Sequence, residues 1–154
     1  MNKSAAAFLL GVVCWGCSGG GDFPVAKTTG TVTCGGQPVP HVLVMFTPVR
    51  KGKEAYSGKT GHAYANEQGE FAVSTYGNGD GAVIGNHGVK VDGPSREDHP
   101  DFQCDCQLGG GVDVAQVEVT KGGENHFEIV LRKMNDQERR RREQEVAEEL
   151  EDLE

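Results

Sequence analysis

Apolar and polar residues alternate over much of residues 29–133, a pattern typical of β-strands that bury one face. The first such segment, Thr29–Val49, holds two alternating runs around a Gly-Gly-Gln-Pro connection. Gly35 and Gly36 allow positive φ there, and Pro38 fixes the exit from the turn. We therefore expect two paired or neighbouring strands that begin the core of a small all-β domain. Their inward-facing residues are predicted to be Val32, Cys34, Val42, Val44 and Phe46.

The segment His62–Thr75 has the sequence of a β-hairpin. Alternating residues flank Asn66-Glu67-Gln68-Gly69, and a type I turn closed by Gly69 in the left-handed region fits this loop. Phe71 and Val73 are predicted to face inward. Because aromatic residues make up only 6% of the chain, Phe71 is expected to be central to the core.

Further strands are predicted in the second half of this region. Ala82–Asp92 has the pattern of one strand, and Asp113–Lys121 with Glu124–Arg132 has that of a last hairpin around Gly122-Gly123. Between them, Gly93–Gly111 has no period and is long for a connection in a compact domain. We expect that loop to be mobile or functional.

Residues 134–154 form a charged tail that is predicted to be helical or disordered. Asn135 followed three residues later by Glu138 is typical of a helix cap. A solvated helix is favoured over one that docks, because its apolar stripe is narrow. That stripe consists of Val146, Leu150 and Leu153.

Length and composition narrow the class of protein. A chain of 154 residues accommodates one ordinary domain with appendages, and its 23 glycines suit short strands joined by many turns. The net charge is −8, and residues 135–154, with nine acids and four bases, contribute five of those negative charges. No folded region is basic enough for a nucleic-acid surface, so nucleic acid is excluded as a partner.

The N-terminus has the form of a signal peptide over residues 1–16. Lys3 precedes the apolar run Ala5–Val13, which is too short to span a bilayer, and small residues follow. Residues 17–28 begin with Cys17 and a Gly-rich stretch that cannot build a core, so we interpret them as a flexible tether.

The end of this run, Cys14-Trp15-Gly16-Cys17, resembles a bacterial lipobox. Gly16 and Cys17 match its pattern, whereas Cys14 stands where leucine is usual. The resemblance implies that Cys17 carries a thioether-linked diacylglycerol and becomes the mature N-terminus. Its acyl chains would anchor the protein in a membrane of the bacterial cell envelope, on the periplasmic or outer face, without a transmembrane helix.

The sandwich region carries a fixed succession of short motifs: Gly30–Thr33, Gly36–Val39, Val42–Pro48, Asn66–Phe71, Gly81–Val91, Val117–Val119 and Asn125–Leu131. Together they resemble the carboxypeptidase regulatory-like domain, which recurs in small bacterial lipoproteins. The resemblance implies a single antiparallel β-sandwich, transthyretin-like or Ig-like, over residues 29–133. It brings no catalytic residues and no cofactor. Cys34 stands where that family usually has an apolar residue, which implies a thiol within the core.

The number of cysteines limits how many disulfides the chain can form. Two belong to the targeting segment, which leaves Cys34, Cys104 and Cys106, enough for at most one disulfide and one free thiol. Three states of Cys104 and Cys106 are compatible with an envelope protein: a disulfide to Cys34, a disulfide to another chain, or free thiols. A zinc site is the alternative, because His99, Cys104 and Cys106 could supply three of four tetrahedral ligands.

No motif for catalysis is present in the sequence. No histidine is followed three residues later by glutamate, and neither a Gly-x-Ser-x-Gly nor a His-Glu-x-x-His motif occurs. The leading hypothesis is therefore a non-enzymatic, lipid-anchored module with a structural, adhesion or ligand-binding role toward an envelope protein or polysaccharide. The alternative is a metal-binding or redox protein that uses His99, Cys104 and Cys106. In a third hypothesis, the tail docks onto another envelope protein.

Overall fold

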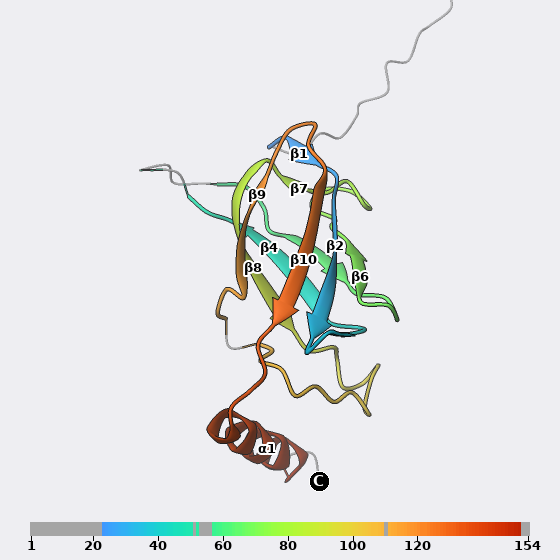
Figure 1. Ribbon diagram of the computed structural model, residues 1–154, viewed down its shortest axis with the longest axis vertical. Coiled ribbons are helices and arrows are strands. Elements are labelled where there is room, and N and C mark those ends of the chain that lie inside the picture. The colour runs from blue at the N-terminus through green and yellow to red at the C-terminus, as the bar shows by residue number, and fades with distance from the viewer. Residues whose placement is uncertain (1–22, 51, 53–56, 110, 152–154) are drawn as a thin grey trace, which may run out of the picture.

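The computed structural model describes residues 23–50, 52, 57–109 and 111–151, so the predicted signal peptide and Cys17 lie outside the described residues. Two four-stranded sheets pack face to face, and a helix follows the last strand (Figure 1). The prediction of an all-β sandwich with a C-terminal helix is confirmed. The elements are β1 Val25–Ala26, β2 Thr28–Cys34, β3 Gln37–Pro38, β4 Leu43–Pro48, β5 Gly61–Tyr64, β6 Glu70–Ala72, β7 Ala82–Val83, β8 Gly85–Asp92, β9 Ala115–Val119, β10 Asn125–Leu131 and α1 Asp136–Glu151.

The first sheet is built around β2, which pairs with β10, β3 and β6. The second has the order β5-β4-β8-β9, and β1 pairs with β7 in a small ribbon. Strands β2 and β10 run parallel in the register Thr28 with Asn125 to Cys34 with Leu131, whereas the other pairs are antiparallel. The expected purely antiparallel arrangement is therefore corrected at this pair. Strand β1 also lies in the stretch assigned to the tether, so the sheets begin before residue 29.

The segments predicted as paired strands and hairpins are divided between the two sheets. The two runs of Thr29–Val49 become β2 and β4, which belong to opposite sheets. Strands β5 and β6 likewise separate, since β5 pairs with β4 and β6 with β2, and His62 with Ser74 makes one isolated bridge between the two arms. Strands β9 and β10 separate in the same way. Alternation identifies the buried face of a strand but not its partner, which is why these pairings were predicted wrongly.

The predicted inward faces are correct for most of the core. Phe46 of β4 is fully buried, and its ring centroid lies 6.0 Å from that of Phe71, 5.9 Å from that of Phe127 and 5.9 Å from that of His87. Gly30 of β2 makes room for this cluster, because a β-carbon there would meet the Phe71 ring and the Phe127 carbonyl oxygen. The aromatic cluster joins the two sheets. The other buried apolar residues include Val32, Val42, Val44, Val73, Val89, Val91, Val119, Ile129 and Leu131.

The turn between β5 and β6 has the geometry that its sequence predicts. Gly69 has a φ of 72°, and its N–H donates to the Asn66 carbonyl at 2.9 Å. The Asn66 side-chain oxygen accepts hydrogen bonds from the N–H groups of Gln68 and Glu70 at 2.9 and 2.8 Å. An asparagine side chain that replaces backbone partners in this way is a common device for closing a tight turn.

Helix α1 begins with the predicted cap. The Asn135 side-chain oxygen accepts the Glu138 N–H at 2.9 Å, and a Glu138 carboxylate oxygen accepts the Asn135 N–H at 2.8 Å. This reciprocal pair is a capping box. The side chains of Val146 and Leu150, and residue Leu153, lie outside what is described, so the apolar stripe stays a prediction. Within the described residues, no helix has the length and apolar character needed to cross a membrane.

Candidate functional site

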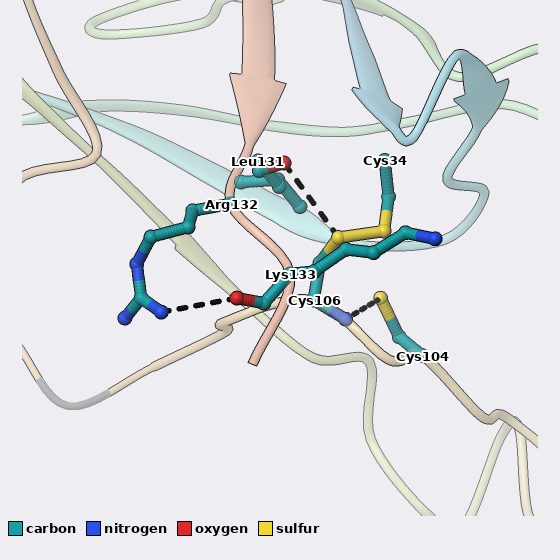
Figure 2. Close-up of a disulfide and its surroundings, with 6 residues drawn as sticks. All are labelled: Cys34, Cys104, Cys106, Leu131, Arg132 and Lys133. Carbon is teal, nitrogen blue, oxygen red and sulfur yellow. Dashed lines mark hydrogen bonds between the residues drawn. A yellow bond between two sulfur atoms is a disulfide. The ribbon is translucent and has the colours of Figure 1, made fainter. Parts of the chain in front are cut away.

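The end of the sandwich at which β2 and β10 finish carries a disulfide between Cys34 and Cys106 (Figure 2). Cys34 closes β2, and the parallel register places Leu131, the last residue of β10, beside it. Cys106 comes from the long loop and forms an isolated bridge with Lys133, just after β10. The loop therefore adds one more short segment to this end of the sheet, beside β10, and the disulfide fixes it there.

Two backbone hydrogen bonds flank the disulfide and hold the loop in place. The Gln107 N–H donates to the Arg132 carbonyl at 2.8 Å, and the Met134 N–H donates to the Asp105 carbonyl at 2.9 Å. The disulfide joins residues 72 positions apart, with Cα atoms separated by 6.1 Å. Closing a loop of that length in the unfolded chain corresponds to about 4 kcal/mol of stabilisation in the chain-entropy account.

The disulfide decides between the interpretations of the cysteines. The core thiol that the resemblance implied at Cys34 is wrong, because this sulfur is bonded to Cys106. The count of one bridge and one free thiol among the three cysteines is confirmed, with Cys104 as the free one. Cys104 is half-buried, and its sulfur accepts the Cys106 N–H at 3.4 Å. The free thiol thus lies against the residue that carries half of the disulfide.

A cleft of about 670 Å³ opens beside these cysteines, and we call it the loop-end cleft. One wall is the turn from β2 through β3 to His41, and the other is the loop segment 98–105, with Lys133 completing the rim. Cys34 and Cys104 line it, whereas Cys106 is fully buried behind them. The cleft therefore brings one cysteine of the disulfide, Cys34, and the free cysteine, Cys104, to the same surface.

Two histidines line the same cleft. His41 is the only non-glycine residue with a positive φ in the described part of the chain, at 64°. Its ring stacks on that of His99, with centroids 3.9 Å apart, and its Nε2 lies 3.2 Å from a Glu67 carboxylate oxygen. Such a backbone conformation is unfavourable for histidine and persists only where its surroundings hold it. Here the His41 N–H donates to the Ala65 carbonyl at 2.9 Å, and the stacked ring and the carboxylate contact the imidazole at the cleft.

The structure leaves only two of the three residues of the predicted zinc site available as ligands. His99 and Cys104 share the loop-end cleft, but the Cys106 sulfur is buried in the disulfide and is no thiolate. Among the residues that the structure describes, no group of three or more histidine, cysteine, aspartate or glutamate side chains is placed to hold a metal ion. The zinc hypothesis therefore lacks one of its three ligands in this disulfide-bonded form.

Sequence reasoning missed the contribution of His41 and of Lys133 to this site. Neither belongs to the long loop, and only the tertiary arrangement brings them to the cleft. The only local indication was the Pro40-His41 dipeptide before a buried strand. It predicts a turn, but it does not show which part of the protein that turn faces. No protein-family profile, curated protein or solved structure matches this chain.

Proposed function

We propose that this protein is a lipid-anchored β-sandwich of the bacterial cell envelope with a non-catalytic role, and that it binds an envelope protein or polysaccharide through the loop-end cleft. The anchor is the acylated Cys17, and the sandwich is of the transthyretin-like, carboxypeptidase regulatory-like type. The observation that carries the proposal is the placement of the cleft relative to the point where the chain enters the sandwich.

The two ends of the sandwich are distinct. The first described residues lead into β1 at one end, whereas the long loop and α1 lie at the other (Figure 1). Strand β2 connects the ends, running from Thr28 to Cys34. A strand of this length spans about 20 Å at about 3.3 Å per residue. An anchor attached before β1 would hold that end toward the bilayer and turn the loop-end cleft away from it.

The chemistry of the cleft suits a polar partner. Its lining combines imidazole rings, carboxylates and an amine with backbone groups of two turns, and the described side chains include His41, Asp98, His99, Asp101 and Lys133. Hydrogen-bonding groups of both charges on an open surface favour recognition of a polysaccharide or a protein segment over an apolar small molecule. The absence of a catalytic motif in the sequence supports a binding role.

The anchor is tested by comparing Cys17→Ser with Cys14→Ser in the full-length protein. Both substitutions remove one sulfur from the same short segment, so Cys14→Ser is a matched control. We expect the wild type and Cys14→Ser to partition into the detergent phase with added acyl mass. Cys17→Ser should lose both properties. A wild-type protein in the aqueous phase, without acyl mass and starting at or beyond Ser18, would contradict the anchor.

The cleft is tested by site-specific photocrosslinking in intact cells. A photoreactive residue at Asp101 lies on the cleft, whereas one at Lys121 lies in the turn between β9 and β10 at the other end of the sandwich (Figure 1). We expect a discrete adduct with envelope protein or polysaccharide from position 101. Equal adducts from both positions, or none from position 101, would contradict binding through the cleft.

A further inference from the structure

Three cysteine side chains lie at this end of the sandwich, and only two of their sulfur atoms are bonded to each other (Figure 2). The free sulfur of Cys104 accepts the N–H of Cys106, so only the backbone and side chain of one residue separate it from the disulfide. Cys34 and Cys104 both line the cleft. A thiol held beside a disulfide is the arrangement from which thiol–disulfide exchange begins.

We propose that Cys34, Cys104 and Cys106 form a thiol–disulfide exchange site. The Cys104 thiol gives its proton to solvent, and its thiolate attacks the Cys34 sulfur. A bond forms between Cys34 and Cys104 while the bond between Cys34 and Cys106 breaks. The electron pair of the broken bond stays on the Cys106 sulfur, which takes up a proton. One disulfide and one thiol are present before and after, so the step needs no outside oxidant or reductant.

The Cys34 sulfur is the one attacked, for two reasons. Cys34 is half-buried and lines the cleft with Cys104, whereas Cys106 is fully buried. Attack on Cys106 would instead join two cysteines separated by a single residue, and a disulfide in so small a ring is strained. Exchange through Cys34 avoids that ring, because the new bridge again joins the end of β2 to the loop.

The Cys34–Cys106 disulfide and a Cys34–Cys104 disulfide would reduce the entropy of the unfolded chain by nearly the same amount. The existing disulfide joins residues 72 positions apart, and a bridge from Cys34 to Cys104 would join residues 70 apart, since 104 − 34 = 70. Loop-closure entropy depends only on the logarithm of loop length, so it scarcely distinguishes the two. Their balance therefore depends on local contacts, chiefly the burial of Cys106 and its bridge to Lys133.

Exchange would change the shape of the loop-end cleft. In the observed form, the disulfide fixes Cys106 beside Lys133 and seats the loop against the end of β10. In the exchanged form, the covalent link would move to Cys104 in the cleft wall, and residues 105–107 would keep only their hydrogen bonds. The site thus offers two covalent forms of the same cleft at a constant oxidation state.

The test uses the full-length protein and the position of Asp105 between the two exchanging cysteines. The oxidised protein is incubated at about pH 8, where thiolates become available, then quenched in acid, denatured and alkylated with a maleimide. A protease that cuts before aspartate places Cys104 in peptide 101–104 and Cys106 in peptide 105–112. We expect about one molecule in ten to carry the maleimide on Cys106, with Cys34 disulfide-bonded to peptide 101–104; that ratio corresponds to about 1.4 kcal/mol.

Two variants identify the attacking sulfur. Cys104→Ser should abolish alkylation of Cys106 while keeping the original disulfide. Cys106→Ser, refolded in a mixture of reduced and oxidised glutathione, should form the bridge from Cys34 to Cys104. The proposal is overturned if maleimide stays confined to Cys104 in the wild type, or if Cys104→Ser leaves Cys106 alkylation unchanged. It is also overturned if Cys34 and Cys104 stay unbridged in Cys106→Ser while its circular dichroism matches the wild type.

Discussion

Replacing Phe46 by alanine tests whether the aromatic cluster between the sheets holds the sandwich together. The Phe46 side chain is fully buried, and its ring lies within 6.0 Å of the rings of Phe71, Phe127 and His87 by centroid distance. Truncation of a buried phenylalanine costs about 3–5 kcal/mol through lost transfer energy and the cavity left behind. Contacts with three rings from both sheets favour the upper end of that range, about 4–5 kcal/mol. Phe71→Ala should cost about 3–5 kcal/mol as well.

Urea unfolding with the disulfide intact measures this loss. Far-ultraviolet circular dichroism reports on the sheets, because the single tryptophan, Trp15, lies outside the described residues. Val130→Ala is the control, because this β10 side chain is 66% exposed and its truncation should change the free energy of unfolding by less than about 0.5 kcal/mol. A loss below about 1 kcal/mol for Phe46→Ala would refute the central role of the cluster.

Four further changes test other parts of the structure. Gly30→Ala should lower the urea midpoint, because the added methyl group meets Phe71 and Phe127 and overpacking costs about 1–3 kcal/mol. Burial lowers the pKa of the His87 imidazole, so below about pH 6.5 the unfolded chain binds a proton that the folded chain does not bind. The thermal midpoint should therefore fall as the pH drops below about 6.5, and His87→Phe should remove this dependence of the midpoint on pH. Hydrogen bonding from Arg132 and the Asn135 N–H lowers the pKa of Glu138 to about 2, so its support of α1 is complete above about pH 4.5 and is lost as pH falls toward 2. The helical circular dichroism signal should therefore decrease as the pH falls from about 4.5 toward 2, and Glu138→Gln should abolish this decrease. Deletion of residues 135–154 should leave the thermal midpoint nearly unchanged, because all but two of the described side chains in that segment are exposed.

The sequence predicted faces and turns well because these depend on local physics. The phase of an alternating run determines which side is buried, and Val44, Phe46 and Val89 are all buried as predicted. The turn closed by Gly69 and the cap at Asn135 were also correct, since each is specified by side chains within a few residues of the backbone groups that they satisfy.

Strand partners and the cysteine pairing depended on tertiary arrangement and were not determined locally. A short turn between two alternating runs fits a hairpin, but it equally fits a chain that crosses from one sheet to the other, as between β9 and β10. The count of three cysteines allowed one disulfide without selecting it. Cys34 and Cys106 meet only because the long loop returns to the end of β2, and no periodicity in Gly93–Gly111 indicates that return.

The parallel pairing of β10 with β2 is the feature that creates the candidate site. In the expected hairpin, β9 and β10 would pair with each other, with no requirement that β10 lie beside β2. In the observed fold, Leu131 lies beside Cys34, so the chain leaves the sheet at the disulfide and Lys133 follows within reach of the loop. That exit gives Cys106 a backbone partner and leaves Cys104 outside the bridge, facing the cleft. The same register therefore positions the loop-end cleft and the free thiol, and it places both at the end of the sandwich opposite β1.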